Sequence, residues 1–366
     1  MTLSQSTDKQ NTVLAGSMPA ARVIFGLIAL AFLIHLGFFA IGVGPTALEA
    51  YYGDAATGSS FYTSLQTLLR ALFVDSIGTG RVFSMMCAMS ALVLLARLCA
   101  SWSGDVVVGA AIPLGVLMFP QTAFTLALAT PHALLMLLTV VGFAATRWVG
   151  DREKSVAPLS LGVVCVALVF LAPSGLGVAA AIIVFVCFEG RGRTFLAMLA
   201  ATICVVGFLL SLWFPIPLSA SPPFGLVETN VLTLQDGLWR AFAMLWVALV
   251  LSAAALLGSV SLRQCIGRDA VRRSMVLGLS FAVSLLWLIF GVASPPADLP
   301  VLFTAVLVLG VVAALPLVLW VRLVMPSIQS VWIWILLPVL MYSCFWVVLG
   351  PINLAAFPYD QIEARP

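Results

Sequence analysis

The stretch "AARVIFGLIALAFLIHLGFFAIGV", residues 20–43, decides the fold class of this chain. It is almost entirely apolar, and about twenty apolar residues in a helix cross the hydrocarbon core of a bilayer. A polar segment, residues 1–19, precedes it, whereas a signal peptide has a short apolar region and a small-residue cleavage site. We therefore expect residues 20–43 to stay in the protein as the first transmembrane helix, with residues 1–19 as a cytoplasmic tail.

The rest of the chain has the same character. Hydrophobic residues make up 63% of the 366 residues and charged residues 8%, whereas roughly a quarter of the residues in soluble domains are charged. The mean hydropathy is +1.17. Apolar stretches between charged or Pro/Gly-rich segments predict an all-α, polytopic transmembrane bundle of about eleven spans within residues 20–350. The other expected spans are 81–100, 105–119, 123–147, 157–172, 175–189, 194–213, 238–260, 274–293, 300–323 and 330–350.

The basic residues predict the orientation of this bundle. If the N-terminus is cytoplasmic, 13 of the 17 Lys and Arg residues fall on the cytoplasmic side, and the exceptions are Arg70, Arg81, Arg240 and Arg365. Cytoplasmic loops of membrane proteins carry such an excess of basic residues. We therefore expect residues 351–366 to form a tail on the outer side.

Two outer loops follow from this orientation, residues 44–80 and residues 214–237. The first contains "SFYTSLQTLLRALFV", whose apolar residues recur at helical spacing. We expect this segment to form an amphipathic helix along the outer membrane surface. The second loop is rich in Pro and Ser and is predicted to be irregular.

Composition also excludes some classes of partner. The seven cysteines mostly lie in apolar runs without CxxC spacing, which indicates small buried hydrophobic residues rather than disulfides or metal ligands. The net charge of +3 is not gathered into a basic block, so we expect no nucleic-acid partner.

The clearest candidates for chemistry lie in "ALEAYYGDAATG", residues 47–58. Glu49 and Asp54 could act as a general base on a hydroxyl group or hold a divalent cation through their oxygens. Tyrosine rings can stack against a sugar and hydrogen-bond to it. The tyrosines concerned are Tyr51, Tyr52 and Tyr62. The competing interpretation is an interfacial belt of aromatic residues with solvated acids.

Two further residues could bind a ligand on the outer side. Arg81 could hold a lipid phosphate through two hydrogen bonds, or it could extend to the headgroups or pair with Asp75. His132 could act as a base or as a phosphate partner, because its ring titrates near neutral pH. The alternative for His132 is a structural role, in a hydrogen bond to a neighbouring helix.

The order of four segments resembles a known family. The segments are "LEAYY", "FYTSLQTLLRALF", "GTGRVFS" and "ATPHALLMLLTV". Together they resemble the bacterial branch of the dolichyl-phosphate-mannose mannosyltransferase-like superfamily, which comprises membrane glycosyltransferases of GT-C fold. The resemblance covers residues 20 to about 190. It implies a bacterial inner-membrane protein that transfers a sugar from a polyprenyl-phosphate carrier to an acceptor on the outer face, without a nucleotide sugar.

This resemblance also assigns roles to residues. It implies that Glu49, helped by Asp54, activates the acceptor hydroxyl. The aromatic residues named above, with Arg81 and His132, would bind the substrate. The sequence identifies no definite cofactor, and a divalent cation could take part.

The chain departs from the family pattern at three places. Leu48 stands where the family has an Asp before the Glu, and Ser64 and Leu65 stand where it has Pro-Pro. His132 replaces the Asp of the family's Thr-Pro-Asp segment. Leu cannot take a proton or bind a metal, so the loss of the Asp removes the family's own candidate base.

Three hypotheses about function follow. The first is a polyprenyl-phosphate-sugar-dependent glycosyltransferase. The second is a catalytically degenerate GT-C relative that binds or scaffolds within a membrane complex, with other membrane proteins as partners. The third is a transporter, which the ionisable residues disfavour because they gather at the ends of the expected spans.

Overall fold

The computed structural model describes several separate parts of the chain. These parts are residues 30, 34, 37, 49, 52, 60–73, 77–103, 126–148, 156–172, 175–188 and 192–215. The expected span 105–119, most of the span 20–43 and every expected element after residue 215 lie outside them. Tyr51 and Asp54 lie outside them as well.

The described part of the chain is all-α and contains six helices, as the sequence predicts for these residues. Their bounds are α3 Ser60–Leu72, α4 Ile77–Ser103, α7 His132–Trp148, α8 Val156–Leu171, α9 Gly175–Phe188 and α10 Arg193–Ser211. The helix expected in the first outer loop is present as α3. The expected span 123–147 is wrong at its start, because a turn occupies residues 128–131 and α7 begins only at His132.

Two of the described helices are long and apolar enough to cross a membrane. They are Gly78–Ser101, with a mean hydropathy of 2.0, and Arg193–Ser211, with a mean hydropathy of 2.3. Half of the residues in the apolar stretch of the first are buried, against 11% in the second. The helix α10 therefore lies on the outside of the described bundle and α4 within it.

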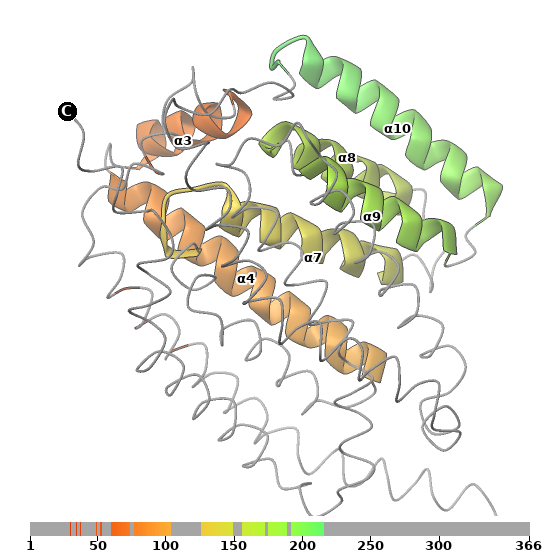
Figure 1. Ribbon diagram of the computed structural model, residues 1–366, viewed down its shortest axis with the longest axis horizontal. Helices are drawn as coiled ribbons and strands as arrows, with labels where there is room; N and C mark the ends of the chain where they lie inside the picture. Colours follow the sequence, from red (N-terminus) through yellow and green to blue (C-terminus); the bar gives the residue numbers. More distant parts are fainter. Residues whose placement is uncertain are drawn as a thin grey trace, which may run out of the picture.

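The helices pack in a continuous series (Figure 1). The contacts run from α4 to α7, from α7 to α8 and α9, and from α8 to α9 and α10, while α3 touches α4 and α8. Apolar side chains fill the space between them, including Leu95, Met136 and Phe185. Since α8 and α9 are apolar around their whole circumference, they suit an environment without water on any side.

The contact between α8 and α10 depends on a glycine. A Cβ atom added to Gly162 would lie 2.7 Å from Cβ and Cγ2 of Thr202, closer than real contacts allow. Small residues let helix backbones approach closely, which is how helices commonly associate in membranes. Gly162 thus sets the separation of these two helices.

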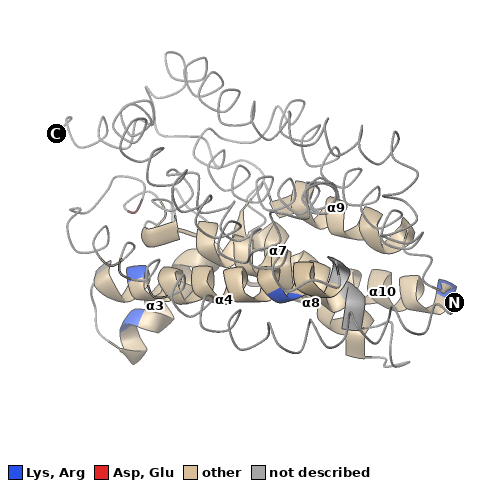
Figure 2. Cartoon of the chain, turned by 90° about the horizontal axis from the view of Figure 1, so that it is seen from below, with Lys and Arg blue, Asp and Glu red and all other residues tan. Residues whose placement is uncertain are grey.

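The ends of the helices gather at two poles of the bundle. The pole that carries α3 also carries the start of α4, and Phe61 of α3 meets Phe214, just after α10, with ring centroids 5.4 Å apart. Arg97 and the first residue of α10, Arg193, lie towards the opposite pole, and both are exposed. Figure 2 shows the basic segments of α3 and of the start of α4 together at one pole, with further basic segments in the middle of the bundle and near the other pole. We refer to the pole with α3 as the α3 end.

The cysteines are only partly as expected. Cys87, Cys99 and Cys165 are free and buried. Cys187 and Cys204 are free but exposed, so the expectation of burial is wrong for them. The reason is that α9 and α10 are apolar on their outward faces as well, so an apolar sequence context does not distinguish inside from outside.

Candidate functional site

A buried ion pair forms the centre of a polar cluster at the α3 end. Arg81, in the first turns of α4, donates from Nε to Oε1 of Glu49 over 2.8 Å and from Nη2 to Oε2 over 2.7 Å. Both residues are almost inaccessible, with 4% of Glu49 and 3% of Arg81 exposed. The two parallel hydrogen bonds match the planar guanidinium to the planar carboxylate, which is the strongest geometry for such a pair.

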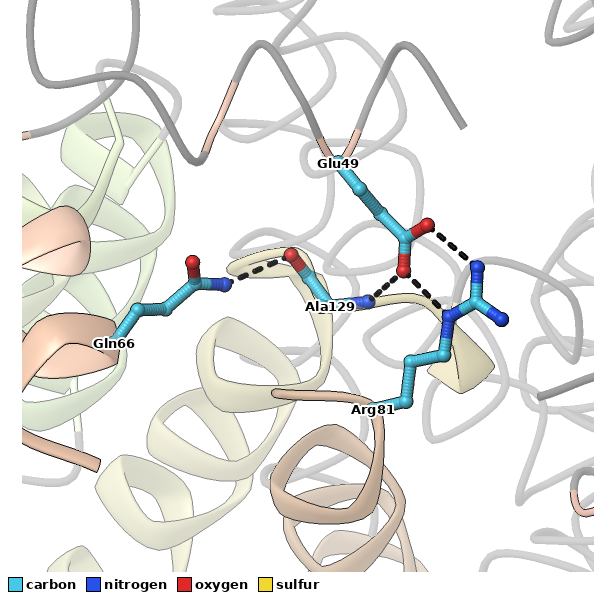
Figure 3. Close-up of polar contacts among 4 residues, drawn as sticks. All are labelled: Glu49, Gln66, Arg81 and Ala129. Carbon is cyan, nitrogen blue, oxygen red and sulfur yellow. Dashed lines mark hydrogen bonds and ion pairs between the residues drawn. The ribbon is translucent and has the colours of Figure 1, made fainter. Parts of the chain in front are cut away.

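The backbone of Ala129 joins this pair to the rest of the cluster (Figure 3). Its N–H donates to Oε1 of Glu49 over 2.8 Å, and its carbonyl accepts a hydrogen bond of 2.9 Å from Nε2 of Gln66. The N–H and the carbonyl of Ala129 are therefore both hydrogen-bonded to side chains. We call the set Glu49, Gln66, Arg81 and Ala129 the clasp.

The local sequence explains why these groups meet. Tyr62 and Gln66 lie four residues apart on α3, so they share one face of the helix, and both are buried. Gly80 lets α4 approach the turn, because a Cβ atom there would lie 2.8 Å from Cβ of Ala129. The turn ends at Pro131, directly before the first residue of α7, and proline is tolerated there because the first N–H groups at a helix start have no intrahelical partner. The carbonyl of Pro131 then accepts from the N–H of Leu135 over 2.8 Å.

Three rings lie beside the clasp. The Tyr52 ring meets the Tyr62 ring edge to face with centroids 6.5 Å apart, and it meets the His132 ring in the same way at 5.8 Å. These are favourable arrangements for aromatic pairs. Thr63 also donates a hydrogen bond to the carbonyl of Tyr52 over 3.3 Å. All three rings are buried, so Tyr52 is fixed against both α3 and α7.

Among the described residues, one ring nitrogen of His132 has a hydrogen-bond partner and the other has none. Its Nδ1 hydrogen-bonds to Oγ1 of Thr130, and Ser84 donates to the carbonyl of Thr130 over 3.5 Å. Nε2 of His132 is buried and has no hydrogen-bond partner among the residues that the structure describes. Buried polar atoms of this kind are uncommon and call for a bound water or ligand group.

Tyr62 is held in its protonated form. Burial raises the pKa of its phenol well above the usual value, because the phenolate would lose its hydration. The nearby polar groups of Gln66 and Ser84 act on this pKa in the opposite direction, but burial dominates. Tyr62 therefore serves as a neutral group and not as a base.

The cluster offers little to a cation. Within the described ranges, no group of three or more His, Cys, Asp or Glu side chains is placed to hold a metal ion. Both oxygens of Glu49 already accept hydrogen bonds from Arg81 and Ala129. The Glu49 carboxylate is thus engaged by donors instead of being open to a divalent cation.

The structure brings together most of the residues that the sequence singles out. Five of them lie in this cluster: Glu49, Tyr52, Tyr62, Arg81 and His132. The positions of Tyr51 and Asp54 lie outside the described residues. Arg81 is buried and pairs with Glu49, so it does not extend to the headgroups, and the alternative partner Asp75 lies outside the described residues.

Sequence reasoning missed the remaining members of the cluster. Gln66 carried a usable signal, because it is a polar residue one turn after Tyr62 on the same face of a predicted helix. Ser84 and Thr130 lie inside quoted motifs, but nothing in their chemistry distinguished them. Ala129 contributes only its peptide group, which every non-proline residue has.

Comparisons with family models, with curated proteins and with solved structures give no match to this chain.

Proposed function

We propose that the chain is a polytopic membrane protein of the GT-C type that binds a polyprenyl-phosphate-linked sugar at the α3 end of its bundle. In this proposal the bundle has about eleven spans, lies in a bacterial inner membrane and carries its α3 end on the outer side. One observation carries the proposal. The segments "LEAYY", "FYTSLQTLLRALF", "GTGRVFS" and "ATPHALLMLLTV" are spread over the chain from Leu48 to Val140, yet they supply one buried cluster.

The geometry of Glu49 favours binding over catalysis. A general base must reach a substrate proton with a free lone pair. Glu49 is buried, its two oxygens accept three hydrogen bonds, and its charge is matched by Arg81. With Leu48 in place of the family Asp, the proposed role is that of a binding or scaffold subunit in a membrane complex, and Glu49 has a structural role.

Sugar transfer is the second candidate function, and one observation favours it. Nε2 of His132 is a buried proton acceptor or donor without a partner among the described residues, beside the ring of Tyr52. A histidine so placed can take a proton from an acceptor hydroxyl. In that case His132, with or without Asp54, would replace Glu49 as the base.

A paired assay of binding and transfer separates these functions. The purified protein in detergent micelles is given a panel of radiolabelled polyprenyl-phosphate sugars, and bound and transferred sugar are measured separately. We expect binding without transfer, and we expect Tyr52→Ala to weaken binding while Leu68→Ala, at an exposed position of α3, does not. Transfer by the wild type that is lost in His132→Gln or Asp54→Asn would instead establish an enzyme. Absence of binding would contradict both candidates.

A further inference from the structure

The face of α3 that meets the clasp continues to Arg70. Tyr62, Gln66 and Arg70 follow one another at intervals of four residues, so they form one stripe along the helix. Gln66 is the member that bonds to Ala129, and Arg70 lies four residues further, about 6 Å along the axis. Arg70 is half-buried, whereas Gln66 is fully buried. The stripe thus leads from the clasp towards the end of α3.

The two arginines at the α3 end differ in whether their guanidinium group could bind an added anion. Arg81 is buried and its charge is matched by Glu49. Among the described residues, Arg70 forms no ion pair and its buried Nε has no hydrogen-bond partner. A buried donor without a partner is costly in free energy, so an anion that accepts from Nε would be favoured there.

The surroundings of Arg70 indicate where that anion comes from. Leu68, Leu72 and Phe73 flank it and are 55%, 66% and 71% exposed. A helix with such an apolar flank lies in the membrane interface, at the depth of the lipid headgroups. An arginine at this depth keeps its alkyl chain in apolar surroundings and presents its guanidinium to phosphates.

From these observations we propose that Arg70, and not Arg81, binds the phosphate group of a membrane lipid beside the clasp. This inference rests on the proposed function only in naming a polyprenyl phosphate as the lipid. A phospholipid headgroup offers the same chemistry, namely an ester phosphate with an anionic oxygen. In both cases the fork of Nε and a terminal nitrogen donates two hydrogen bonds to two phosphate oxygens.

Equilibrium binding in dodecyl maltoside micelles tests this assignment, because that detergent contains no phosphate. The probes are undecaprenyl monophosphate, undecaprenol and phosphatidylglycerol, and the proteins are wild type, Arg70→Gln, Arg70→Lys and Arg97→Gln. Arg97 is the matched control, since it is an exposed arginine on α4 towards the opposite pole. Thermal unfolding of each variant checks that it is folded.

We expect Arg70→Gln to raise the Kd for undecaprenyl monophosphate about tenfold or more, because the variant loses a charge-assisted pair of hydrogen bonds. Arg70→Lys should fall between this variant and wild type, and Arg97→Gln should stay within about twofold. Undecaprenol, which lacks the phosphate, should bind the four proteins alike.

Each other outcome has a definite meaning. Equal binding of undecaprenyl monophosphate by wild type and Arg70→Gln would overturn the assignment of Arg70 and leave the proposed function standing. Binding of phosphatidylglycerol alone, weakened by Arg70→Gln, would support the phosphate site and contradict the proposed polyprenyl ligand. If wild type bound neither phosphate lipid, both proposals would fall.

Discussion

The stability of the folded protein is expected to depend on both partners of the ion pair between Glu49 and Arg81. Replacing Glu49 with Gln would leave the guanidinium of Arg81 buried without a counter-charge. We expect Glu49→Gln to lower the free energy of unfolding by on the order of 3 kcal/mol, as for other broken buried pairs. The measurement is thermal or denaturant unfolding in detergent micelles.

A double variant provides the control for this prediction. Glu49→Gln combined with Arg81→Gln removes both charges, so the unpaired guanidinium no longer contributes. The double variant should therefore be less destabilised than the sum of the two single variants. If Glu49→Gln unfolds at the same midpoint as wild type, Glu49 does not contribute to stability. Its carboxylate would then again be a candidate for the general base.

Because the phenol of Tyr62 is buried, we expect the stability of the protein to depend on pH. Burial raises the pKa of its phenol in the folded state, while the unfolded chain ionises near the ordinary value of about 10. Its contribution is therefore fully present below about pH 10 and is lost as pH rises further, at up to about 1.4 kcal/mol per pH unit. Unfolding midpoints measured between pH 8 and about pH 11.5 should fall less steeply for Tyr62→Phe than for wild type. Identical slopes would mean that Tyr62 ionises in the folded protein.

At this scale, sequence reasoning identified residue types but not their partners. The sequence marked Glu49 and Arg81 as polar groups at the rim of the expected bundle. It could not show that they meet, because 31 positions separate them in the chain and the ion pair depends on the path between. The same pairing turns two candidate ligand-binding groups into a single neutral unit.

The interface of α8 and α10 offers a matched test at the scale of the helices. Gly162→Ala and Gly207→Ala are the same change on facing helices, and alanine improves helix propensity in both by about 1 kcal/mol. A Cβ atom at Gly162 meets Thr202 at 2.7 Å, whereas one at Gly207 meets only Cγ2 of Val166 at 4.0 Å. Thermal unfolding should show Gly162→Ala destabilised, by about 1–3 kcal/mol of overpacking, and Gly207→Ala unchanged or more stable. Equal effects would mean that the helices can separate without cost.

Helix boundaries were predictable where charges or glycines interrupt the apolar runs. The expected ranges 157–172 and 175–189 differ from α8 and α9 by one residue at most. The start of α7 was not predictable in this way, because Leu126, Ala127 and Leu128 are as apolar as the helix that follows. The turn before α7 is specified instead by Pro131 and by hydrogen bonds to distant residues, which hydropathy does not record.

At the scale of the whole molecule, the orientation is a prediction that labelling can test. In a background with Cys187, Cys204, Cys265 and Cys344 changed to Ala, single cysteines are introduced by Ser64→Cys or Arg193→Cys. Ser64 is exposed on α3 and Arg193 is exposed at the other pole. A membrane-impermeant maleimide should label Ser64→Cys in intact bacterial cells and Arg193→Cys only after permeabilisation. The reverse pattern would show that the basic residues were assigned to the wrong side.

The order of motifs along the chain carried the global information. The structure places described residues of the four quoted segments in one cluster, and the family resemblance that first grouped these segments stays a prediction. The chemistry of that cluster was less accessible, because the resemblance assigns roles by position, whereas burial and hydrogen bonds decide whether a carboxylate is available.

The double attachment of Ala129 limits what evolution and engineering can change at this position. The cluster uses the peptide group of residue 129 and leaves no room for a larger side chain opposite Gly80. The methyl side chain of Ala129 therefore gives no sign of the role that its peptide group has in the cluster. Proline is excluded on both grounds, because it has no N–H to donate to Glu49 and its ring is larger than the alanine side chain that fits opposite Gly80.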